Sequence, residues 1–314
     1  MGPRKKGNLV WMTNIIKKVG VIYGGKSAER EVSINTGKAV AAALKSENYN
    51  VVMLDSAEEK FVNNVLASRI DMAFLSLHGG YGENGTIQGF FEILGIPYTG
   101  SGVTASSLAM NKKFTKNIFS AAGINTPRWL IVNAENKHFV TEIFDFPAVV
   151  KPVSQGSAIG VSIVRKEKDC AKAIDEAMLH GDEVIVEEYI EGTEITVAML
   201  GEKPLTPIQI IPKNKFYDYY SKYAAGGSEH IIPPRLSQGI IKNAKALALR
   251  AHHALGCRVF SRVDIIVDKK NKLHVLEVNT LPGMTATSLY PDAAKFDGWE
   301  FGSLLKEIIR LSMN

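Results

Sequence analysis

A pair of strand-like runs near the C-terminus constrains this chain more than any other feature. RVDIIV (residues 262–267) and LHVLEVN (residues 273–279) are rich in Val and Ile, and the polar segment DKKNK separates them. This pattern predicts a β-hairpin. Because Asn271 tolerates turn conformations, we expect Lys270 and Asn271 to form a two-residue tip.

The register that follows from this tip puts two acidic side chains opposite each other. Asp264 lies opposite Glu277 and Arg262 lies opposite Asn279, and the four side chains share one face. Facing carboxylates repel, but a cation between them removes the repulsion. Two carboxylates and an amide oxygen suit Mg²⁺ or Mn²⁺, and Mg²⁺ commonly completes its shell with substrate phosphates. Asp264, Glu277 and Asn279 therefore predict a metal site that binds a nucleotide phosphate.

A different interpretation of the same hairpin stays open. An ion pair from Arg262 to Asp264 or Glu277 on a solvated face would relieve the repulsion with no metal. The next segment favours the phosphate site, because Pro282, Gly283 and the polar residues after them form a loop that offers backbone N–H groups.

Length and composition describe an ordinary soluble protein with room for two or three domains. The chain has 314 residues, 46% of them hydrophobic and 22% charged. No apolar run approaches the roughly 20 residues of a membrane span, and the basic N-terminus lacks the apolar core of a signal peptide. Two distant cysteines, Cys170 and Cys257, favour a reducing, cytoplasmic compartment. The net charge of +5 is dispersed, so we expect no nucleic-acid partner. Because no run is apolar enough for a membrane span, we expect no membrane partner either.

The run LEVNTLPGMTATSL, with RVD ahead of it, resembles the C-terminal signature of the D-alanine:D-alanine ligases, which are members of the ATP-grasp superfamily. The resemblance implies an α/β fold with α+β elements, the ATP-grasp fold, in three domains. It divides the chain into an N-terminal extension (1–17), an N-terminal α/β domain (18–102), a central subdomain (103–190) and a C-terminal subdomain (191–314). ATP would lie between the central and C-terminal domains.

The N-terminal third has the pattern of an α/β layer. An apolar strand at residues 18–23 enters a Gly turn, and a helix follows with Ser27 or Ser33 as its cap. Strands at residues 49–54 and 71–77 come at the intervals of a parallel sheet.

Glu29 lies in the run SAEREVS at the carboxyl edge of that sheet, where open α/β folds bind ligands. By itself it would be an ordinary solvated helix residue. The resemblance implies that Glu29 helps to hold the ammonium group of the first D-alanine. It also makes His78, in HGGYGENG, a neighbour of that substrate, with Asn84 where the family more usually has Asp.

Two lysines frame a Gly- and Ser-rich loop in the middle third. A helix that begins near residue 101 carries Lys112, and a strand ends at Lys151. The loop VSQGSAIGVSIV after that strand could wrap an anion with backbone N–H groups, although it lacks the GxxxxGK[ST] order of Walker phosphate loops. Alone, each lysine would be a solvated surface charge. The resemblance implies that both contact the ATP phosphates and that Ser157 is a pivot of a loop that closes over ATP and substrate.

Residues 184–200 form a strand, a turn and a second strand. Each glutamate in this run would by default be a surface carboxylate. The resemblance implies that Glu187, with backbone atoms of Tyr189 and Ile190, binds adenine and ribose. It also implies that Glu194 binds the ribose hydroxyls.

An aromatic, Gly-containing stretch at residues 213–236 fits neither a helix nor a strand. Long irregular loops inside compact domains are usually functional. Lys222 and Tyr223 match the KY pair of the resembled family. There the Lys approaches the phosphates, and the Tyr hydroxyl bonds the positions of Ser157 and Glu29.

The activity that the resemblance implies is the ligation of two D-alanines for peptidoglycan synthesis. The first carboxylate attacks the γ-phosphate of ATP, and the second amine displaces phosphate from the acyl phosphate. Arg262 and the Gly283 N–H would stabilise the oxyanion, while Ser288 and the Leu289 N–H would hold the second carboxylate. The cofactors would be ATP and two Mg²⁺ or Mn²⁺ ions, and the expected assembly is a homodimer.

Three alternatives remain. A ligase that takes D-lactate or D-serine second would share nearly every residue, although the Tyr223 loop favours D-alanine. If the chain were another ATP-grasp carboxylate–amine ligase, its match to the SAEREVS and HGxxGE blocks would be a coincidence. A non-catalytic nucleotide-binding protein of the same fold should have lost part of the hairpin set, yet all four residues are present: Arg262, Asp264, Glu277 and Asn279.

Overall fold

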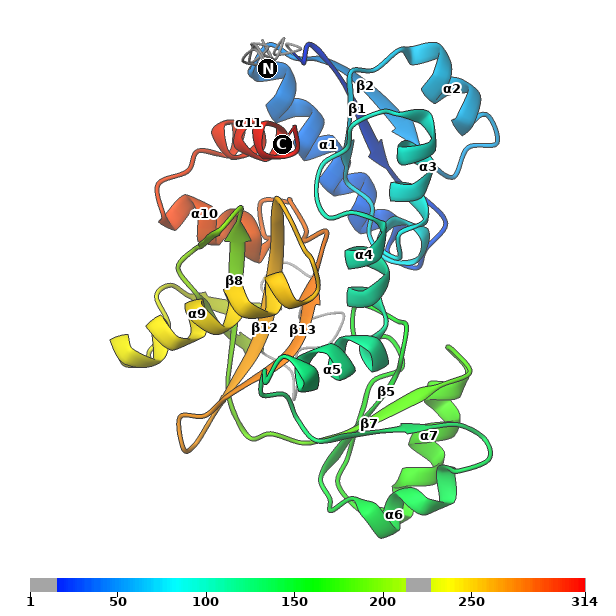
Figure 1. Ribbon diagram of the computed structural model, residues 1–314, viewed down its shortest axis with the longest axis vertical. Helices are drawn as coiled ribbons and strands as arrows, with labels where there is room; N and C mark the ends of the chain where they lie inside the picture. Colours follow the sequence, from blue (N-terminus) through cyan, green and yellow to red (C-terminus); the bar gives the residue numbers. More distant parts are fainter. Residues whose placement is uncertain (1–15, 213–226, 314) are drawn as a thin grey trace, which may run out of the picture.

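The computed structural model describes residues 16–212 and 227–313, which form three sheets (Figure 1). The first sheet is parallel, as predicted, with the order β2-β1-β3. Its strands are β1 (Lys18–Tyr23), β2 (Asn50–Asp55) and β3 (Met72–Leu75). The helices of this part are α1 (Arg30–Ser46), α2 (Phe61–Ser68) and α3 (Thr86–Leu94).

Neither serine expected to cap the first helix does so. Glu29 is the N-cap of α1, and no side chain caps that helix end. Ser33 instead accepts a hydrogen bond from Gly24 N–H at 2.8 Å and donates to the Ser76 carbonyl at 2.7 Å. Ser27 donates to the His78 carbonyl at 2.6 Å. Both hydroxyls therefore tie the Gly turn to the end of β3, and they hold the region around Glu29 in place.

The second sheet is antiparallel, with the order β4-β7-β5-β6. Its strands are β4 (Trp129–Val132), β5 (Ala148–Pro152), β6 (Ser162–Val164) and β7 (Val184–Glu188). The helices α6 (Val140–Ile143) and α7 (Cys170–Met178) lie with it at the lower right of Figure 1. Residues of α7 share a hydrophobic core with β5 and β7, so this sheet has a core of its own.

The third sheet has the order β11-β10-β8-β12-β13, with β9 paired to β8. Its strands are β8 (Gly192–Leu200), β9 (Lys203–Pro204), β10 (Ile208–Pro212), β11 (Ser228–Ile231), β12 (Phe260–Asp268) and β13 (Leu273–Asn279). Helix α9 (Gln238–Ala254) packs on it. The chain crosses from the second sheet to the third between β7 and β8, so residues 189–191 connect the two sheets.

The helix expected from residue 101 is two helices, α4 (Val103–Met110) and α5 (Lys112–Ala121). The break is at Asn111, whose backbone is extended and whose side chain accepts a hydrogen bond from Phe114 N–H at 3.2 Å. This N-cap starts α5 in a new direction, and it puts Lys112 at the first position of that helix.

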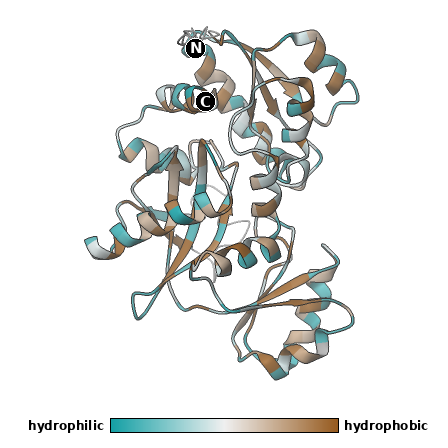
Figure 2. Ribbon diagram, in the orientation of Figure 1, coloured by the Kyte–Doolittle hydropathy of each residue, from teal (hydrophilic) through white to brown (hydrophobic). Residues whose placement is uncertain are grey.

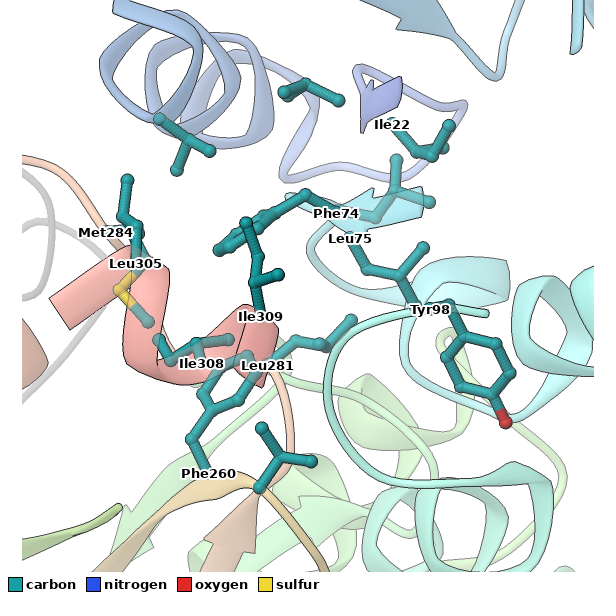
Figure 3. Close-up of a cluster of buried hydrophobic side chains, with 14 of the residues drawn as sticks. Ile22, Phe74, Leu75, Tyr98, Phe260, Leu281, Met284, Leu305, Ile308 and Ile309 are labelled. Atoms are coloured by element: carbon teal, nitrogen blue, oxygen red, sulfur yellow. The ribbon is translucent and has the colours of Figure 1, made fainter. Parts of the chain in front are cut away.

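The last helices, α10 (Leu289–Phe296) and α11 (Phe301–Leu311), return to the N-terminal sheet. Figure 3 shows Leu305, Ile308 and Ile309 between side chains of the N-terminal sheet and those near the end of the third sheet, including Phe74 and Phe260. Likewise α4 and α5 share a core with α9, β12 and β13. Each of these cores contains segments that are far apart in the chain. They therefore do not mark domain limits along the sequence, and the predicted limits stay a prediction.

Figure 2 shows strands that are mainly hydrophobic and helices whose polar residues alternate with apolar ones. Short 3-10 turns occur at Gly80–Gly82, Lys137–Phe139 and Glu167–Asp169. None of the helices in the described ranges is both long enough and apolar enough to span a bilayer.

Candidate active site

The C-terminal hairpin has the predicted register at its functional end. Asp264 pairs with Glu277 and Arg262 pairs with Asn279 across β12 and β13. Asp264 also pairs with Thr196 of β8 on its other side, so β12 lies inside the sheet, whereas β13 with Glu277 and Asn279 forms the edge. The prediction that these acidic residues face each other is confirmed.

The predicted two-residue tip is wrong. Asp268 N–H donates to the Lys272 carbonyl at 2.9 Å, which leaves a three-residue loop with Asn271 at φ +63°. Three-residue hairpin loops commonly end in such a left-handed residue. The ladder shifts by one residue next to Asp264, so a bulge at Leu276 compensates for the longer loop and restores the predicted pairing.

Asp264 is neutralised by a neighbour on its own strand. Arg262 donates from Nε to one Asp264 oxygen at 3.0 Å and from Nη2 to the other at 2.9 Å. Thr196 Oγ1 donates to the same carboxylate at 2.6 Å. The ion pair of the metal-free interpretation is therefore present, but the face is not solvated, because Asp264 is only 4% exposed.

Two cavities meet beside Glu277. The inter-sheet cavity, an open space of about 1610 Å³, lies between the second and third sheets. The central cavity, an open space of about 870 Å³, lies where the N-terminal part, the end of the hairpin and the start of α10 meet. Their common wall consists of Glu277, Lys112 and the loop residues 155–157. A molecule in one cavity would thus lie next to a molecule in the other.

Every predicted site residue that the structure describes lines one of these cavities. The inter-sheet cavity has Lys112, Lys151, Ser157, Glu187, Tyr189, Ile190, Glu194, Asp264 and Glu277 in its walls. The central cavity has Glu29, His78, Lys112, Ser157, Arg262, Glu277, Asn279, Gly283, Ser288 and Leu289. Lys222 and Tyr223 lie outside the described residues.

The Gly- and Ser-rich loop reaches the N-terminal part through Glu29. Ser157 Oγ donates a short hydrogen bond to Glu29 Oε1, and both residues are buried. Gly79 and Gly156 approach the other carboxylate oxygen so closely that a Cβ would lie 2.5 Å and 3.3 Å from it. Ser157 and the residue after it both have positive φ, a backbone state that non-Gly residues adopt only when their surroundings hold them there.

His78 lines the central cavity together with Glu29 and is itself buried among polar groups. Its Nε2 is 3.0 Å from Thr36 Oγ1, and its Nδ1 is 3.7 Å from Glu83 Oε1. Burial raises the pKa of Glu83, and the Glu29 charge acts in the same direction. Sequence reasoning missed Glu83, although it belongs to the same HGGYGENG run. Asn84, the departure from the family pattern, lines neither cavity.

The lysines expected by default to be surface charges are buried. Lys112 is 7% and Lys151 is 8% exposed. Lys112 Nζ donates to the Gln155 carbonyl in the Ser157 loop. Lys151 Nζ lies 2.9 Å from Glu187 Oε2, so the Glu187 carboxylate is ion-paired inside the cavity wall.

A third lysine, Lys116, contacts the same carboxylate and was missed in the sequence. Its Nζ lies 3.0 Å from Glu187 Oε1. Burial lowers the pKa of Lys116 to about 8 against the opposing effect of Glu187. Burial acts to raise the pKa of Glu187, but the two lysines outweigh it and lower that pKa. Burial also opposes the charge of Lys151, yet Glu187 and Glu277 raise its pKa. The spacing of Lys112 and Lys116, one helical turn, was the available signal.

The loop after the hairpin and the start of α10 line the central cavity. Ser288 Oγ accepts a hydrogen bond from Thr285 N–H at 3.0 Å, and a Cβ on Gly283 would lie 2.8 Å from that oxygen. Helix α10 begins at Leu289, and the first N–H groups of a helix have no partner within the helix. This wall can therefore bind a carboxylate.

Among the described residues, no three His, Cys, Asp or Glu side chains form a cluster that could hold a metal ion. The predicted metal site has two carboxylates and an amide. The Asn279 amide oxygen also accepts a hydrogen bond from Leu281 N–H at 3.1 Å.

Comparisons with known proteins agree over nearly the whole chain. A family model described as D-ala D-ala ligase C-terminus matches residues 118–310, and one described as D-ala D-ala ligase N-terminus matches residues 18–67 and 55–101. A D-alanine–D-alanine ligase of Pelotomaculum thermopropionicum is 48% identical over 310 residues, which cover 94% of this chain and 96% of the relative.

Two solved structures extend this similarity to the fold. The D-alanine–D-alanine ligase from Bacillus anthracis complexed with ATP has a TM-score of 0.84 at 35% identity, covering 95% of this chain and 97% of that one. The VanG D-Ala:D-Ser ligase from Enterococcus faecalis has a TM-score of 0.81 at 31% identity, covering 95% and 99%. The fold is the ATP-grasp fold of these ligases. The chain belongs to the D-alanine–D-alanine ligase family.

Proposed function

We propose that this protein joins two D-alanines to form D-alanyl-D-alanine, a peptidoglycan precursor, and cleaves ATP to ADP and phosphate in doing so. The observation that carries the proposal is the common wall of the two cavities. A nucleotide in the inter-sheet cavity would direct its terminal phosphate at a carboxylate in the central cavity, and this proximity is what an acyl-phosphate mechanism needs.

ATP would bind in the inter-sheet cavity. Lys112 and Lys151 would contact the phosphates, while Glu187 and the backbone of Tyr189 and Ile190 would bind adenine and ribose. Glu194 would bind the ribose hydroxyls. These roles are supported by the position of all six residues in the walls of that one cavity.

A divalent ion fits the donors of the hairpin. Asp264 and Glu277 line the inter-sheet cavity, and their oxygens, with that of Asn279, are the ligands that Mg²⁺ prefers. We assign these three residues to two Mg²⁺ or Mn²⁺ ions, which would neutralise phosphate charge when bound. Arg262, which bonds both oxygens of Asp264, would compete with metal for that carboxylate.

The two D-alanines would bind in the central cavity. Glu29, with His78 beside it, would hold the ammonium group of the first, so that its carboxylate attacks the γ-phosphate. Ser288 and the Leu289 N–H would hold the carboxylate of the second, so that its amine attacks the acyl phosphate. The tetrahedral intermediate then develops an oxyanion, which the following donors would stabilise: the Arg262 guanidinium and the Gly283 N–H.

Water must be excluded from the acyl phosphate. The Ser157–Glu29 hydrogen bond already joins the Gly- and Ser-rich loop to the N-terminal part. On the basis of the family resemblance alone, we propose that Tyr223 extends this link and that Lys222 approaches the phosphates. Exclusion of water would favour attack by the amine.

D-lactate or D-serine as second substrate, and a non-catalytic nucleotide-binding role, are not favoured. The relative with 48% identity is a D-alanine–D-alanine ligase, whereas the D-Ala:D-Ser ligase is 31% identical.

A cytoplasmic location and a homodimer stay parts of the proposal. The buried cysteines Cys170 and Cys257 form no disulfide, which suits a reducing compartment such as the cytoplasm. Analytical sedimentation would test whether the protein is a homodimer.

The test is phosphate release from ATP with D-alanine, L-alanine, D-serine or D-lactate added, together with detection of the product. We expect release with D-alanine alone and one dipeptide per phosphate. L-Alanine should give none, and D-serine or D-lactate should support turnover only when D-alanine is present and at lower rates. Release that no D-amino acid stimulates would refute the proposal.

A further inference from the structure

Lys116 is a buried cation behind the nucleotide site. It lies on α5, its side chain is fully buried, and it lines neither cavity. Its Nζ is 3.0 Å from Glu187 Oε1 and donates to Thr126 Oγ1 at 2.5 Å. Thr126 in turn donates to the Val275 carbonyl of β13 at 2.8 Å. This chain of contacts fixes the Lys116 ammonium between the second and third sheets.

The two oxygens of Glu187 have different lysines as partners. Oε1 lies next to Lys116, whereas Oε2 lies 2.9 Å from Lys151. Of the two lysines, only Lys151 lines the inter-sheet cavity. A phosphate in that cavity can therefore attract Lys151 but cannot make direct contact with Lys116.

Binding of a triphosphate creates a problem for Glu187. As Lys151 turns toward a phosphate, it weakens its ion pair with Glu187, which is 2% exposed. A buried carboxylate without a partner is strongly unfavourable, so Glu187 would hold Lys151 back. Lys116 removes this obstacle, because it remains beside Glu187 whether or not a nucleotide is bound.

We propose that Lys116 is a positioning residue for ATP: it keeps Glu187 ion-paired and in place, so that Lys151 is released to bind phosphate. This inference rests on the proposed function of the inter-sheet cavity. It assigns to Lys116 no contact with any substrate. Its effect is on nucleotide affinity and not on the affinity for D-alanine.

The experiment compares nucleotide binding by the wild-type protein and Lys116→Met, with an unreactive ATP analogue and Mg²⁺ in a calorimeter. Met has a similar volume and no charge, so Lys151 becomes the sole cation beside Glu187 in the part of the chain that the structure describes. We expect the dissociation constant to rise about tenfold or more, because truncating one member of a buried charge pair penalises the other. The KM for D-alanine should stay within about twofold, since the central cavity is unchanged.

Two further variants separate positioning from a purely structural role. Adding Glu187→Gln to Lys116→Met removes the charge that retains Lys151 but keeps a side-chain oxygen for the proposed contact with adenine and ribose. The double variant should therefore bind the nucleotide more tightly than Lys116→Met alone. Lys113→Met is the matched control. It removes a neighbouring lysine of α5 whose ion pair with Glu183, at 2.6 Å, lies near the surface, and we expect no change in nucleotide affinity.

If Lys116→Met does not fold, Thr126→Val tests the same idea more mildly. It removes the hydroxyl that holds the Lys116 ammonium, and we expect a loss of about threefold in nucleotide affinity. Wild-type affinity in Lys116→Met, or in Thr126→Val where that variant replaces it, would overturn the inference. So would a double variant that binds more weakly than Lys116→Met. Failure of the wild-type protein to bind the nucleotide would instead refute the proposed function.

Discussion

Two buried carboxylates lie on the walls of the inter-sheet cavity, and they are neutralised in different ways. Asp264 bonds Arg262, two residues away on the same strand, and Thr196 on the next strand. Glu187 has two cations, and both come from other elements: Lys116 from α5 and Lys151 from β5. One arrangement is local in sequence, whereas the other depends on how distant elements pack.

The difference also has a functional meaning. Arg262 and Lys151 both line cavities and can be drawn to substrates, so each carboxylate stands to lose a partner during the reaction. Glu187 would keep Lys116. Of its partners among the described residues, Asp264 would keep only the neutral Thr196 hydroxyl. The comparison therefore predicts that Asp264 needs a metal ion in the loaded enzyme and that Glu187 does not.

The largest effect is expected from Arg262→Met. This change removes the cation beside Asp264 and a proposed oxyanion donor, so kcat should fall by about a hundredfold or more. Affinity for Mg²⁺·ATP should stay within about threefold, because metal would replace Arg262 at Asp264. Steady-state phosphate release and calorimetry measure the two quantities. A kcat within tenfold of the wild-type value would show that Arg262 only balances charge.

Arg310→Met is the matched control for that variant. Arg310 also bonds a carboxylate twice, that of Glu307, with both distances at 2.7 Å, but on an exposed helix. Exposed pairs contribute about 0–1 kcal/mol. We therefore expect unchanged kinetics and a small change in stability.

An intermediate effect is expected from Glu277→Gln. The variant keeps the shape of the side chain but loses a charged ligand, so nucleotide affinity in Mg²⁺ should fall about tenfold. Without Mg²⁺, the wild-type and variant proteins should differ little. A titration of nucleotide with and without the metal distinguishes these cases. If the variant and the wild-type protein bind the nucleotide equally in Mg²⁺, Glu277 is not a metal ligand. Arg262 would then be the group that balances the charge of Asp264.

The smallest effect is expected from Ser157→Ala. It breaks the hydrogen bond between Ser157 and Glu29 but removes no charge, so kcat should fall only about three- to tenfold. Because water would reach the acyl phosphate more easily, phosphate released per dipeptide should rise above one. Parallel assays of phosphate and dipeptide give this ratio. An unchanged ratio would mean that the bond does not help to exclude water.

The same contrast explains what the sequence could predict. Alternation along two strands was enough for the pairing of Asp264 with Glu277, because side-chain direction in a hairpin is fixed by counting. The predicted two-residue tip was wrong. The real loop is one residue longer, and the bulge at Leu276 adds one residue to the same strand pair, so the predicted pairing of Asp264 with Glu277 results all the same. The parallel N-terminal sheet was also predictable from its strand intervals.

Contacts between distant segments were beyond sequence patterns. Lys116 lies one helical turn after Lys112, but this spacing alone could not show that the packing of α5 buries it beside Glu187. The caps of α1 were missed for a related reason: Ser27 and Ser33 bond the turn after β3 instead of their own helix. The clustering of Glu29 with Ser157 was expected only through the family resemblance.

The central claim is that a carboxylate in the central cavity attacks a phosphate delivered from the inter-sheet cavity. D-Alanine labelled with ¹⁸O in its carboxylate tests this directly, because the attack leaves one carboxylate oxygen in the phosphate that is released. Mass spectrometry of that phosphate should find one ¹⁸O for each dipeptide formed. Unlabelled phosphate, with the dipeptide still produced, would contradict the acyl-phosphate mechanism and the joint use of the two cavities.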